Sequence, residues 1–391
     1  MDLLPILNAY NKFRETHLKD RFFKHHDLML LLAKHTTNVA QEVAGLSQEG
    51  REIKLLRLGQ GPTKVFLWSQ MHGDETTGTL ALMDLLNFLG HKAFYLTASK
   101  ILSSCTLYLM PMVNPDGAER FTRRTAQQID VNRDYLATQS PEAKILKGAH
   151  KHIAPSFGFN LHDQSDLWGL KNSAHPAALS FLAPAFDEDC SLNENRKQAM
   201  QVIACMKASL EAQLPGKIGL FDDTHEPRAF GDNFQRSGTA TMLIEGGRII
   251  GDKESQLVRK MVFAAILAGL QAISTKAYAE LTLNDYFSIP KNSKTLFHII
   301  IKNIEIQGIR TSVGINYKPM VQPNGLTVNH FYSVEDIGDL HTMHAYQVYE
   351  GAKLKIGGIL LFDQPANFDL LDGKERVLSF KDGILQSKVI F

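Results

Sequence analysis

Residues 65–90 read VFLWSQMHGDETTGTLALMDLLNFLG, so that an apolar run, a polar turn and a second apolar segment follow one another directly. The run 65–70 is short and uninterrupted, which is typical of a buried strand. Residues 76–90 repeat apolar side chains at helical spacing, begin with threonines suited to capping and end at a glycine, which predicts a helix. The polar tetrapeptide HGDE lies at the junction, directly after the strand.

The alternation of strand and helix extends on both sides of this stretch. Short apolar strands are predicted at 53–58, 107–113, 157–162 and 240–245, and helices at 141–152, 194–213 and 253–273. This pattern predicts an α/β domain whose mixed, mostly parallel sheet is flanked by helices.

The two ends of the chain have a different character. Residues 1–48 carry mostly helical periodicity, and we expect them to form an N-terminal helical segment of a domain that spans 1–275. Beyond residue 276, apolar stretches alternate with Gly, Asn, Asp and Pro, and no long helix is indicated. The strand-like stretches are 296–301, 345–349, 354–361 and 389–391. We therefore predict a small all-β domain over 276–391, whose role the sequence does not indicate.

Composition narrows the class of protein. The 391 residues include 42 Lys and Arg against 41 Asp and Glu, a formal net charge of +1. A nucleic-acid partner is not expected, because binding phosphates needs a clustered basic excess. Three cysteines lie outside any CxxC motif, which favours reduced thiols. The N-terminus does not resemble a signal peptide, and no apolar run reaches the roughly 18 residues of a membrane helix. We expect a cytoplasmic protein without a membrane partner; an oligomeric state is not indicated.

Groups suited to a metal site end three of the predicted strands. His72 and Glu75 follow the strand at 65–70, His162 ends the segment SFGFNLHDQ, and Glu245 ends ATMLIEGG. Open α/β sheets assemble their sites at the carboxyl ends of their strands. A hydrolytic zinc site commonly uses two His and a carboxylate, keeps one position for water, and needs a second carboxylate to take the proton of that water. HGDE alone is a weak signal, but three such strand ends together indicate a site.

Six short motifs, HGDE, NPDG, RRT, DVNRD, NLH and LIEGG, occur in this order over roughly residues 48–270. This set resembles the zinc carboxypeptidase family, which includes carboxypeptidase A. The resemblance implies that His72, Glu75 and His162 bind one zinc ion per chain. It also implies that Glu245 is the general base that activates the zinc-bound water.

Further site residues follow from the same resemblance. Arg123 matches the arginine that stabilises the developing oxyanion, and Arg124 is the alternative if the register slips by one residue. Asn132 and Arg133 match the pair that binds the terminal carboxylate of the substrate. Asp130 matches the carboxylate that hydrogen-bonds the first ligand, His72.

Three functions are compatible with these residues. The first is a metallocarboxypeptidase, a hydrolase that removes the C-terminal residue of a peptide; NPDG followed by RRT favours it. The expected substrate is a peptide or an acyl amino acid with a free carboxylate. The second is an N-acyl amino acid deacylase of the aspartoacylase and succinylglutamate desuccinylase type. It is favoured by the β domain and by the absence of tyrosine from 163–244, the region in which the zinc carboxypeptidase family has a mobile tyrosine. His225 in FDDTHEPRAFGDN is a candidate substitute for this tyrosine. The third is a non-catalytic binding protein, against which the complete set of ligands, base and arginines argues.

Overall fold

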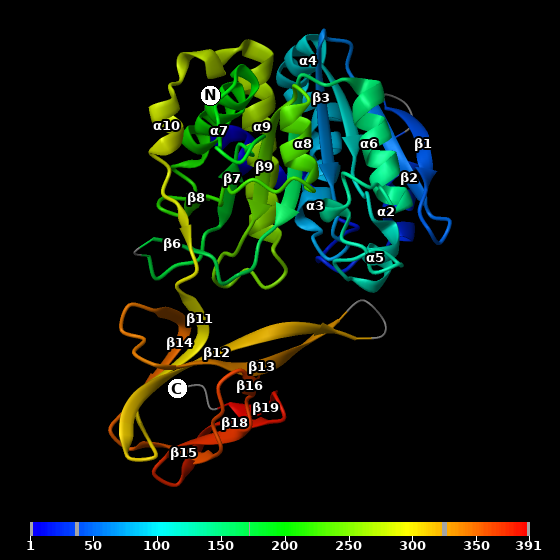
Figure 1. The fold of residues 1–391 in the computed structure, drawn as a ribbon. Coiled ribbons are helices and arrows are strands. Elements are labelled where there is room, and N and C mark those ends of the chain that lie inside the picture. The colour runs from blue at the N-terminus through cyan, green and yellow to red at the C-terminus, as the bar shows by residue number, and fades with distance from the viewer. Residues whose placement is uncertain (1–2, 36–38, 172, 323–326, 389–391) are drawn as a thin grey trace. The chain divides into compact units, whose positions relative to one another are not determined.

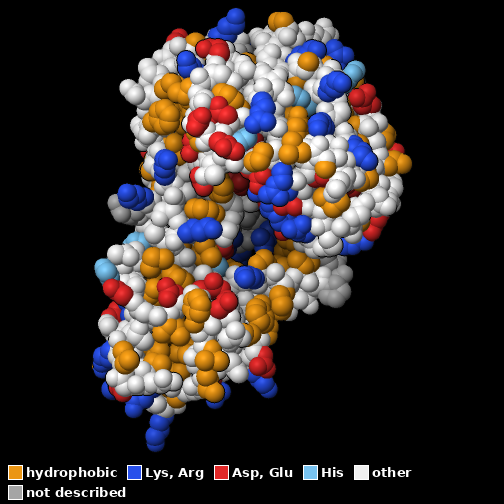
Figure 2. Space-filling model, viewed as in Figure 1, with side chains coloured by type: hydrophobic (Ala, Val, Ile, Leu, Met, Phe, Trp, Pro, Cys, Tyr) orange, Lys and Arg blue, Asp and Glu red, His pale blue; other side chains and the backbone are white. Residues whose placement is uncertain are grey.

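The computed structural model describes residues 3–35, 39–171, 173–322 and 327–388. The chain divides into two compact units (Figure 1). Unit 1 comprises Met1–Asp166 and Ala177–Asn292, and unit 2 comprises Leu167–Pro176 and Ser293–Phe391. On the face seen in Figure 2, acidic and basic side chains are interspersed, in keeping with the formal net charge of +1.

Unit 1 is built on an eight-stranded sheet with the strand order β1-β2-β4-β3-β5-β9-β7-β8. The four central strands β4, β3, β5 and β9 run parallel to one another, while the pairs β1–β2, β2–β4 and β9–β7 are antiparallel. The predicted mixed, mostly parallel sheet is therefore confirmed. The strands are β1 Ala40–Leu46, β2 Glu52–Leu58, β3 Thr63–Ser69, β4 Cys105–Met110, β5 Phe157–Asp163, β7 Leu179–Leu182, β8 Ile218–Leu220 and β9 Ala240–Gly246.

Helices cover both faces of this sheet because its central strands are apolar on both sides. In β3, Val65 and Leu67 pack into a core formed with α3, α4, α7 and α9, whereas Phe66 and Trp68 pack into a second core formed with α6 and α8. Buried parallel strands of this kind read as continuous apolar runs. The helices are α3 Thr77–Gly90, η2 Lys92–Phe94, α4 Tyr95–Ser104, α5 Pro115–Arg120, η3 Val131–Arg133, α6 Pro141–Ile153, α7 Glu194–Leu210, α8 Phe230–Arg236 and α9 Gln256–Thr275.

The N-terminal segment is only partly helical. It contains α1 Leu4–Asn8, η1 Tyr10–Lys12 and α2 His25–Leu32, but residues 40–46 form the edge strand β1 and not the expected helix. Strand β1 pairs antiparallel with β2 through a register irregularity between Val43 and Gly45. The helical expectation fails here because this long-range pairing, and not the local periodicity, decides the conformation.

A buried ion pair holds the N-terminal segment against the helices. Arg259 of α9 and Asp84 of α3 are fully buried and paired, with Arg259 Nε 2.7 Å from Asp84 Oδ2. The Asp84 carboxylate also accepts hydrogen bonds from the Tyr10 hydroxyl and the Glu15 N–H. Arg259 donates in turn to the carbonyls of Glu15 and Leu18, each at 2.9 Å. The segment is thus an integral part of unit 1.

Helix α9 departs from the expectation that no segment is long and apolar enough to cross a membrane. By length and composition it meets that test, because Arg259 and Lys260 are the only charged residues in it. Of its apolar window, 83% is buried inside the protein, where the helix packs on α3 and α7. It is a core helix of unit 1.

Unit 2 is rich in sheet, which confirms the predicted β character of the C-terminal region. Nine strands form one sheet in the order β16-β13-β12-β11-β15-β17-β18-β19, with β14 beside β11. Its core includes Ile301, Val313, Leu370 and Leu378. The strands of this sheet are β11 Leu296–Ile306, β12 Ile309–Val321, β13 Val328–Gly338, β14 His344–Glu350, β15 Leu354–Gly358, β16 Gln364–Pro365, β17 Phe368–Asp372, β18 Glu375–Lys381 and β19 Ile384–Lys388. The short strand β6 Gly169–Leu170 also belongs to unit 2, and β10 Asn292–Ser293 contains the last residue of unit 1 and the residue that follows it.

The boundary between the units lies at Asn292 and Ser293, beyond the position expected near residue 276. The intervening residues form η4 Ala277–Glu280 and α10 Leu283–Phe287, both of which pack against α7 of unit 1. Tyr286 is buried, and its hydroxyl accepts a hydrogen bond from the Ala183 N–H at 3.2 Å. This contact between distant segments is not visible in local periodicity. The strand-like stretch predicted at 389–391 lies outside the described residues.

Candidate metal centre

The HGDE motif forms the turn that connects β3 to α3. Strand β3 ends at Ser69, the N–H of Glu75 donates to the carbonyl of His72 at 3.1 Å, and α3 begins at Thr77. A side chain at Gly73 would overlap the backbone of Gly117, so Gly73 permits the HGDE turn to pack against the NPDG segment. The turn is therefore shaped by a second motif that is distant in sequence.

Asn114 of the NPDG motif links three segments of the site. Its side-chain oxygen accepts a hydrogen bond from the Gly117 N–H at 2.9 Å and thereby caps α5. Its Nδ2 donates to the carbonyls of Met71 and Arg123, each at 3.3 Å. The sequence indicated the turn at NPDG but not this linking role, for which the buried amide is the structural signal.

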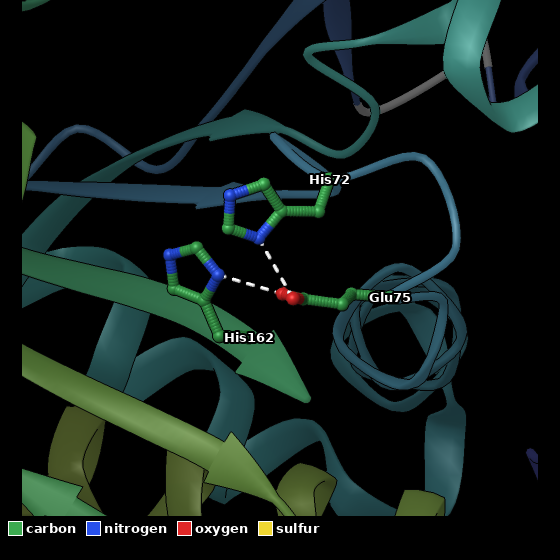
Figure 3. Close-up of side chains that lie close together, drawn as sticks. All are labelled: His72, Glu75 and His162. Carbon is green, nitrogen blue, oxygen red and sulfur yellow. Dashed lines mark hydrogen bonds and ion pairs between the residues drawn. The ribbon is translucent and has the colours of Figure 1, made fainter. Parts of the chain in front are cut away.

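His72, Glu75 and His162 converge on one point (Figure 3). Nδ1 of His72 lies 2.7 Å from Glu75 Oε1, and Nδ1 of His162 lies 2.7 Å from Glu75 Oε2. Figure 3 shows both imidazole rings directed at the Glu75 carboxylate, His162 from the end of β5 and the other two from the β3–α3 turn. One ligand atom from each residue lies within 4.8 Å of those of the others.

This donor set fits zinc. Two imidazoles and one carboxylate are the ligands of open, catalytic zinc sites, which leave a position for water or substrate. His72 and His162 are buried, and Glu75 is nearly so, as expected for groups held by a closed scaffold. The three residues predicted to bind the metal are thus brought together by the fold.

The protonation of the cluster reflects its burial and its charges. Burial lowers the pKa of His72, but the Glu75 charge and the hydrogen bond with Asp130 outweigh it and raise that pKa to about 9. Burial lowers the pKa of His162, against the Glu75 charge. For Glu75, burial acts to raise the pKa, but the two histidines hold it below its usual value. Glu75 is therefore a carboxylate in this setting.

Glu245 lies beside the cluster on the neighbouring strand. The register of β5 and β9 pairs His162 with Glu245 directly, so that both side chains leave the same face of the sheet. Glu245 is buried, and its Oε2 has no hydrogen-bond partner among the described residues. Burial, followed by the charges of Glu75 and Asp163, raises its pKa well above the usual value. A buried carboxylate oxygen without a partner is consistent with a group that meets a ligand.

Asp163 is a site residue that the sequence reasoning did not single out. Its N–H donates to Glu75 Oε2 at 3.2 Å, and its Oδ2 accepts the N–H of Thr77, at the start of α3, at 3.1 Å. It therefore fixes the end of β5 against the turn that carries Glu75. The available signal was its position directly after His162 in NLHDQ.

Asp130 and Arg123 extend the cluster on its open side. Asp130 Oδ1 lies 3.1 Å from His72 Nε2, as expected for a carboxylate that orients a ligand histidine. Arg123 donates from Nε to Asp130 Oδ2 at 3.0 Å, and its Nη1 lies 3.3 Å from Glu75 Oε1 and 3.0 Å from His72 Nδ1. Arg124 instead donates to the carbonyl of Gln128 at 2.9 Å, so of the two arginines it is Arg123 that reaches the cluster.

Asn132 and Arg133 occupy η3, close in sequence to Asp130. The N–H of Asn132 donates to Asp130 Oδ1 at 3.0 Å, and its side-chain oxygen accepts the N–H of Phe230 at 2.9 Å. Arg133 is 38% exposed and forms an ion pair with Glu226, its Nε lying 3.2 Å from Oε2. The structure gives Arg133 no contact with the three ligand residues within the described ranges.

The segment 221–233 contains His225, the candidate substitute for a mobile tyrosine, and side-chain contacts hold this histidine in place. Nδ1 of His225 lies 3.2 Å from Asp232 Oδ1, and its Nε2 lies 3.0 Å from Arg236 Nη2. Both ring nitrogens are thus engaged, which leaves His225 poorly suited to replace a mobile phenol. Phe230 is buried in the core with Tyr135.

Comparison with solved structures identifies the class of fold. The chain is similar to a metallo-carboxypeptidase from Burkholderia cenocepacia, with 18% identity, coverage of 66% of this chain and 70% of that one, and a TM-score of 0.52. It is also similar to carboxypeptidase A from Helicoverpa armigera, with 14% identity, coverage of 71% and 81%, and a TM-score of 0.51. The fold is that of the metallo-carboxypeptidases.

Sequence comparison points to the same group of proteins. Residues 25–164 match the family model described as zinc carboxypeptidase, the family that the motifs resemble. Carboxypeptidase 2 of Trichophyton rubrum is 28% identical over 146 residues, which are 34% of this chain and 27% of that protein. Carboxypeptidase B of Astacus astacus is 29% identical over 176 residues, 43% of this chain and 52% of that protein. The chain thus matches about a quarter to a half of the length of these relatives.

Proposed function

We propose that the protein is a zinc-dependent carboxypeptidase that hydrolyses the C-terminal peptide bond of substrates with a free carboxylate. The observation that carries this proposal is the convergence of His72, Glu75 and His162 next to the buried Glu245. The match of residues 25–164 to the zinc carboxypeptidase family model supports the same chemistry. Zinc held by the three ligands would lower the pKa of a bound water and polarise the scissile carbonyl.

The residues around the ligands have distinct roles in this proposal. Glu245 takes the proton of the attacking water on Oε2 and delivers it to the leaving amine, because this oxygen has no competing partner. Arg123 offers guanidinium N–H groups on the open side of the cluster, where it stabilises negative charge that develops on the carbonyl oxygen. Asp130 orients both His72 and Arg123.

Selection of the C-terminus is assigned to Asn132 and Arg133. A guanidinium matches a carboxylate in charge and geometry, and η3 places Arg133 next to the segment that holds Asp130. A peptide with an amidated C-terminus lacks the charge that this arginine recognises. The proposal therefore predicts a preference for free acids over amides.

A panel of peptides with free and amidated C-termini, together with N-acyl amino acids, tests this function. We expect the zinc-loaded protein to hydrolyse the free-acid peptides. On these peptides Arg133→Ala should lower kcat/KM by a factor that corresponds to on the order of 2 kcal/mol, and on the amides the decrease should be much smaller. Arg124→Ala is the matched control, because its side chain bonds only the Gln128 carbonyl among the contacts described. Faster hydrolysis of N-acyl amino acids than of peptides would instead identify a deacylase.

A further inference from the structure

The guanidinium of Arg133 is already occupied by a carboxylate of the same chain. Its Nε lies 3.2 Å from Glu226 Oε2, while its Nη1 donates to the neighbouring carbonyl of Asn132 at 2.8 Å. Glu226 is also bound by Arg228, whose Nε donates to Oε1 at 2.9 Å and whose Nη2 donates to Oε2 at 2.8 Å. One carboxylate is therefore shared between two arginines, and Arg228 holds it bidentately.

The backbone fixes Glu226 at this position. Its N–H donates to Asp232 Oδ1, in the first turn of α8, at 2.9 Å. Two residues later, the carbonyl of Arg228 accepts the N–H of Tyr135 at 3.1 Å, which ties the loop to the segment that follows Arg133. The pairing of Glu226 with Arg133 is thus a consequence of main-chain contacts at both ends of a short loop.

The pairing remains open to exchange, because all three side chains are accessible. The exposed fraction is 38% for Arg133, 27% for Glu226 and 55% for Arg228. Exposed pairs of this kind are weak, since water competes for both partners. Glu226 is ionised, because the hydrogen bonds from Arg228 outweigh burial and, with the charge of Arg133, lower its pKa.

We infer that Glu226 is an internal competitor for Arg133, which the terminal carboxylate of the substrate displaces while Arg228 retains Glu226. This inference rests on the proposed function, since it takes Arg133 as the group that binds the substrate carboxylate. Binding then exchanges one carboxylate for another on the same guanidinium, so the affinity gained is a difference between two pairs. A neutral C-terminus cannot make this exchange, and Glu226 therefore contributes to the selection of acids.

Substitutions of Glu226 and of Arg228 have opposite expected effects on the binding of acids. Glu226→Gln removes the competitor, so we expect the dissociation constant and KM of free-acid ligands to fall about two- to five-fold, which corresponds to a weak, exposed pair. Arg228→Gln removes the group that retains Glu226 and should raise both constants. In the Glu226→Gln background the Arg228 effect should disappear, because Arg228 acts through Glu226 alone. If the two substitutions acted only through the general surface charge, their separate effects would instead add in the double variant.

The experiment uses the zinc-loaded full chain and two readouts. Binding of N-acetylglycine and N-acetylglycinamide is measured by NMR titration, and KM and kcat are measured on matched acid and amide peptides. The variants are Glu226→Gln, Arg228→Gln and their double substitution, with Asp222→Asn as the control. Asp222 is an exposed carboxylate of the same loop whose described bonds are to Thr224.

Tighter binding of the acid, but not of the amide, by Glu226→Gln supports the competition even if no peptide is hydrolysed, in which case only the proposed function fails. Hydrolysis with a KM unchanged by Glu226→Gln, or changed equally by Asp222→Asn, overturns the competition and leaves the function standing. Weaker binding of acids by Glu226→Gln, or a loss confined to peptides with basic residues, also overturns it and makes Glu226 a substrate-binding group.

Discussion

His162 and Glu245 are direct neighbours on two parallel strands, β5 and β9, at the carboxyl edge of the central sheet. The register that pairs them places a candidate metal ligand and the proposed proton acceptor side by side on one face of the sheet. A shift of either strand by one residue would turn one of these side chains into the opposite core. The chemistry of the site therefore depends on a strand register as well as on the identity of the residues.

The first prediction concerns the metal. His72→Ala and His162→Ala should each lose stoichiometric zinc, because each removes one of three ligands in a buried cluster. Metal analysis of the purified variants, and the shift of Tm on adding zinc, provide the measurement. His225→Ala is the control, since its ring nitrogens contact Asp232 and Arg236 and not the cluster. Retention of one zinc per chain in both ligand variants would contradict the assignment.

The second prediction concerns Glu245. Glu245→Gln preserves the shape of the side chain but cannot accept a proton, so we expect zinc to be retained and kcat to fall by roughly 10²–10⁴. Metal content and steady-state kinetics are measured on the same preparation. Glu254→Gln, which alters an exposed carboxylate, should behave as wild type. Turnover of Glu245→Gln at the wild-type rate would show that another group is the base.

The third prediction concerns the ion pair between Asp84 and Arg259. Asp84→Ala leaves the buried guanidinium without its charge partner and also removes the acceptor of the Tyr10 hydroxyl, so the free energy of unfolding should fall by about 3–5 kcal/mol. Urea unfolding measures this change. The exposed pair of Lys207 and Glu211 is the control, and Glu211→Ala should change stability by less than about 1 kcal/mol. Equal decreases in the free energy of unfolding in Asp84→Ala and Glu211→Ala would contradict the prediction.

The fourth prediction concerns pH and His150. Its ring stacks on Phe234 with centroids 3.6 Å apart, and burial lowers its pKa from 6.5 to about 4. Below pH 6.5 the histidine is protonated in the unfolded chain, whereas in the folded protein it stays neutral until about pH 4. The free energy of unfolding therefore falls by at most about 3 kcal/mol as the pH is lowered through this window. His150→Phe cannot titrate and should lose this part of the pH dependence.

Urea unfolding of wild type and His150→Phe at pH 8 and at pH 4.5 isolates the effect. At pH 8 the histidine is neutral in both states, so the difference between the two proteins there reports packing and the lost bond to Thr239 alone. At pH 4.5 the difference should shift in favour of the variant. The same difference at both pH values would contradict the prediction.

Much of the α/β domain was predictable from local patterns. The helix predicted at 76–90 is α3, Thr77–Gly90, and the strands predicted at 157–162 and 240–245 are β5 and β9 with one further residue each. These elements are apolar, end at clear polar or glycine signals, and are specified within a few residues along the chain. The edge strand β1 and the short helix α10 were not predictable, because their partners β2 and α7 are supplied by other parts of the chain.

The sequence by itself determined the chemical groups of the site, since His72, Glu75, His162 and Glu245 are recognisable from their motifs and from the strand ends they occupy. Only the tertiary structure decided which groups meet. It brings Arg123 and not Arg124 to the ligands, and it pairs Arg133 with Glu226. Local propensity acts over a few residues, whereas these contacts join segments that approach only after the sheet has set its register.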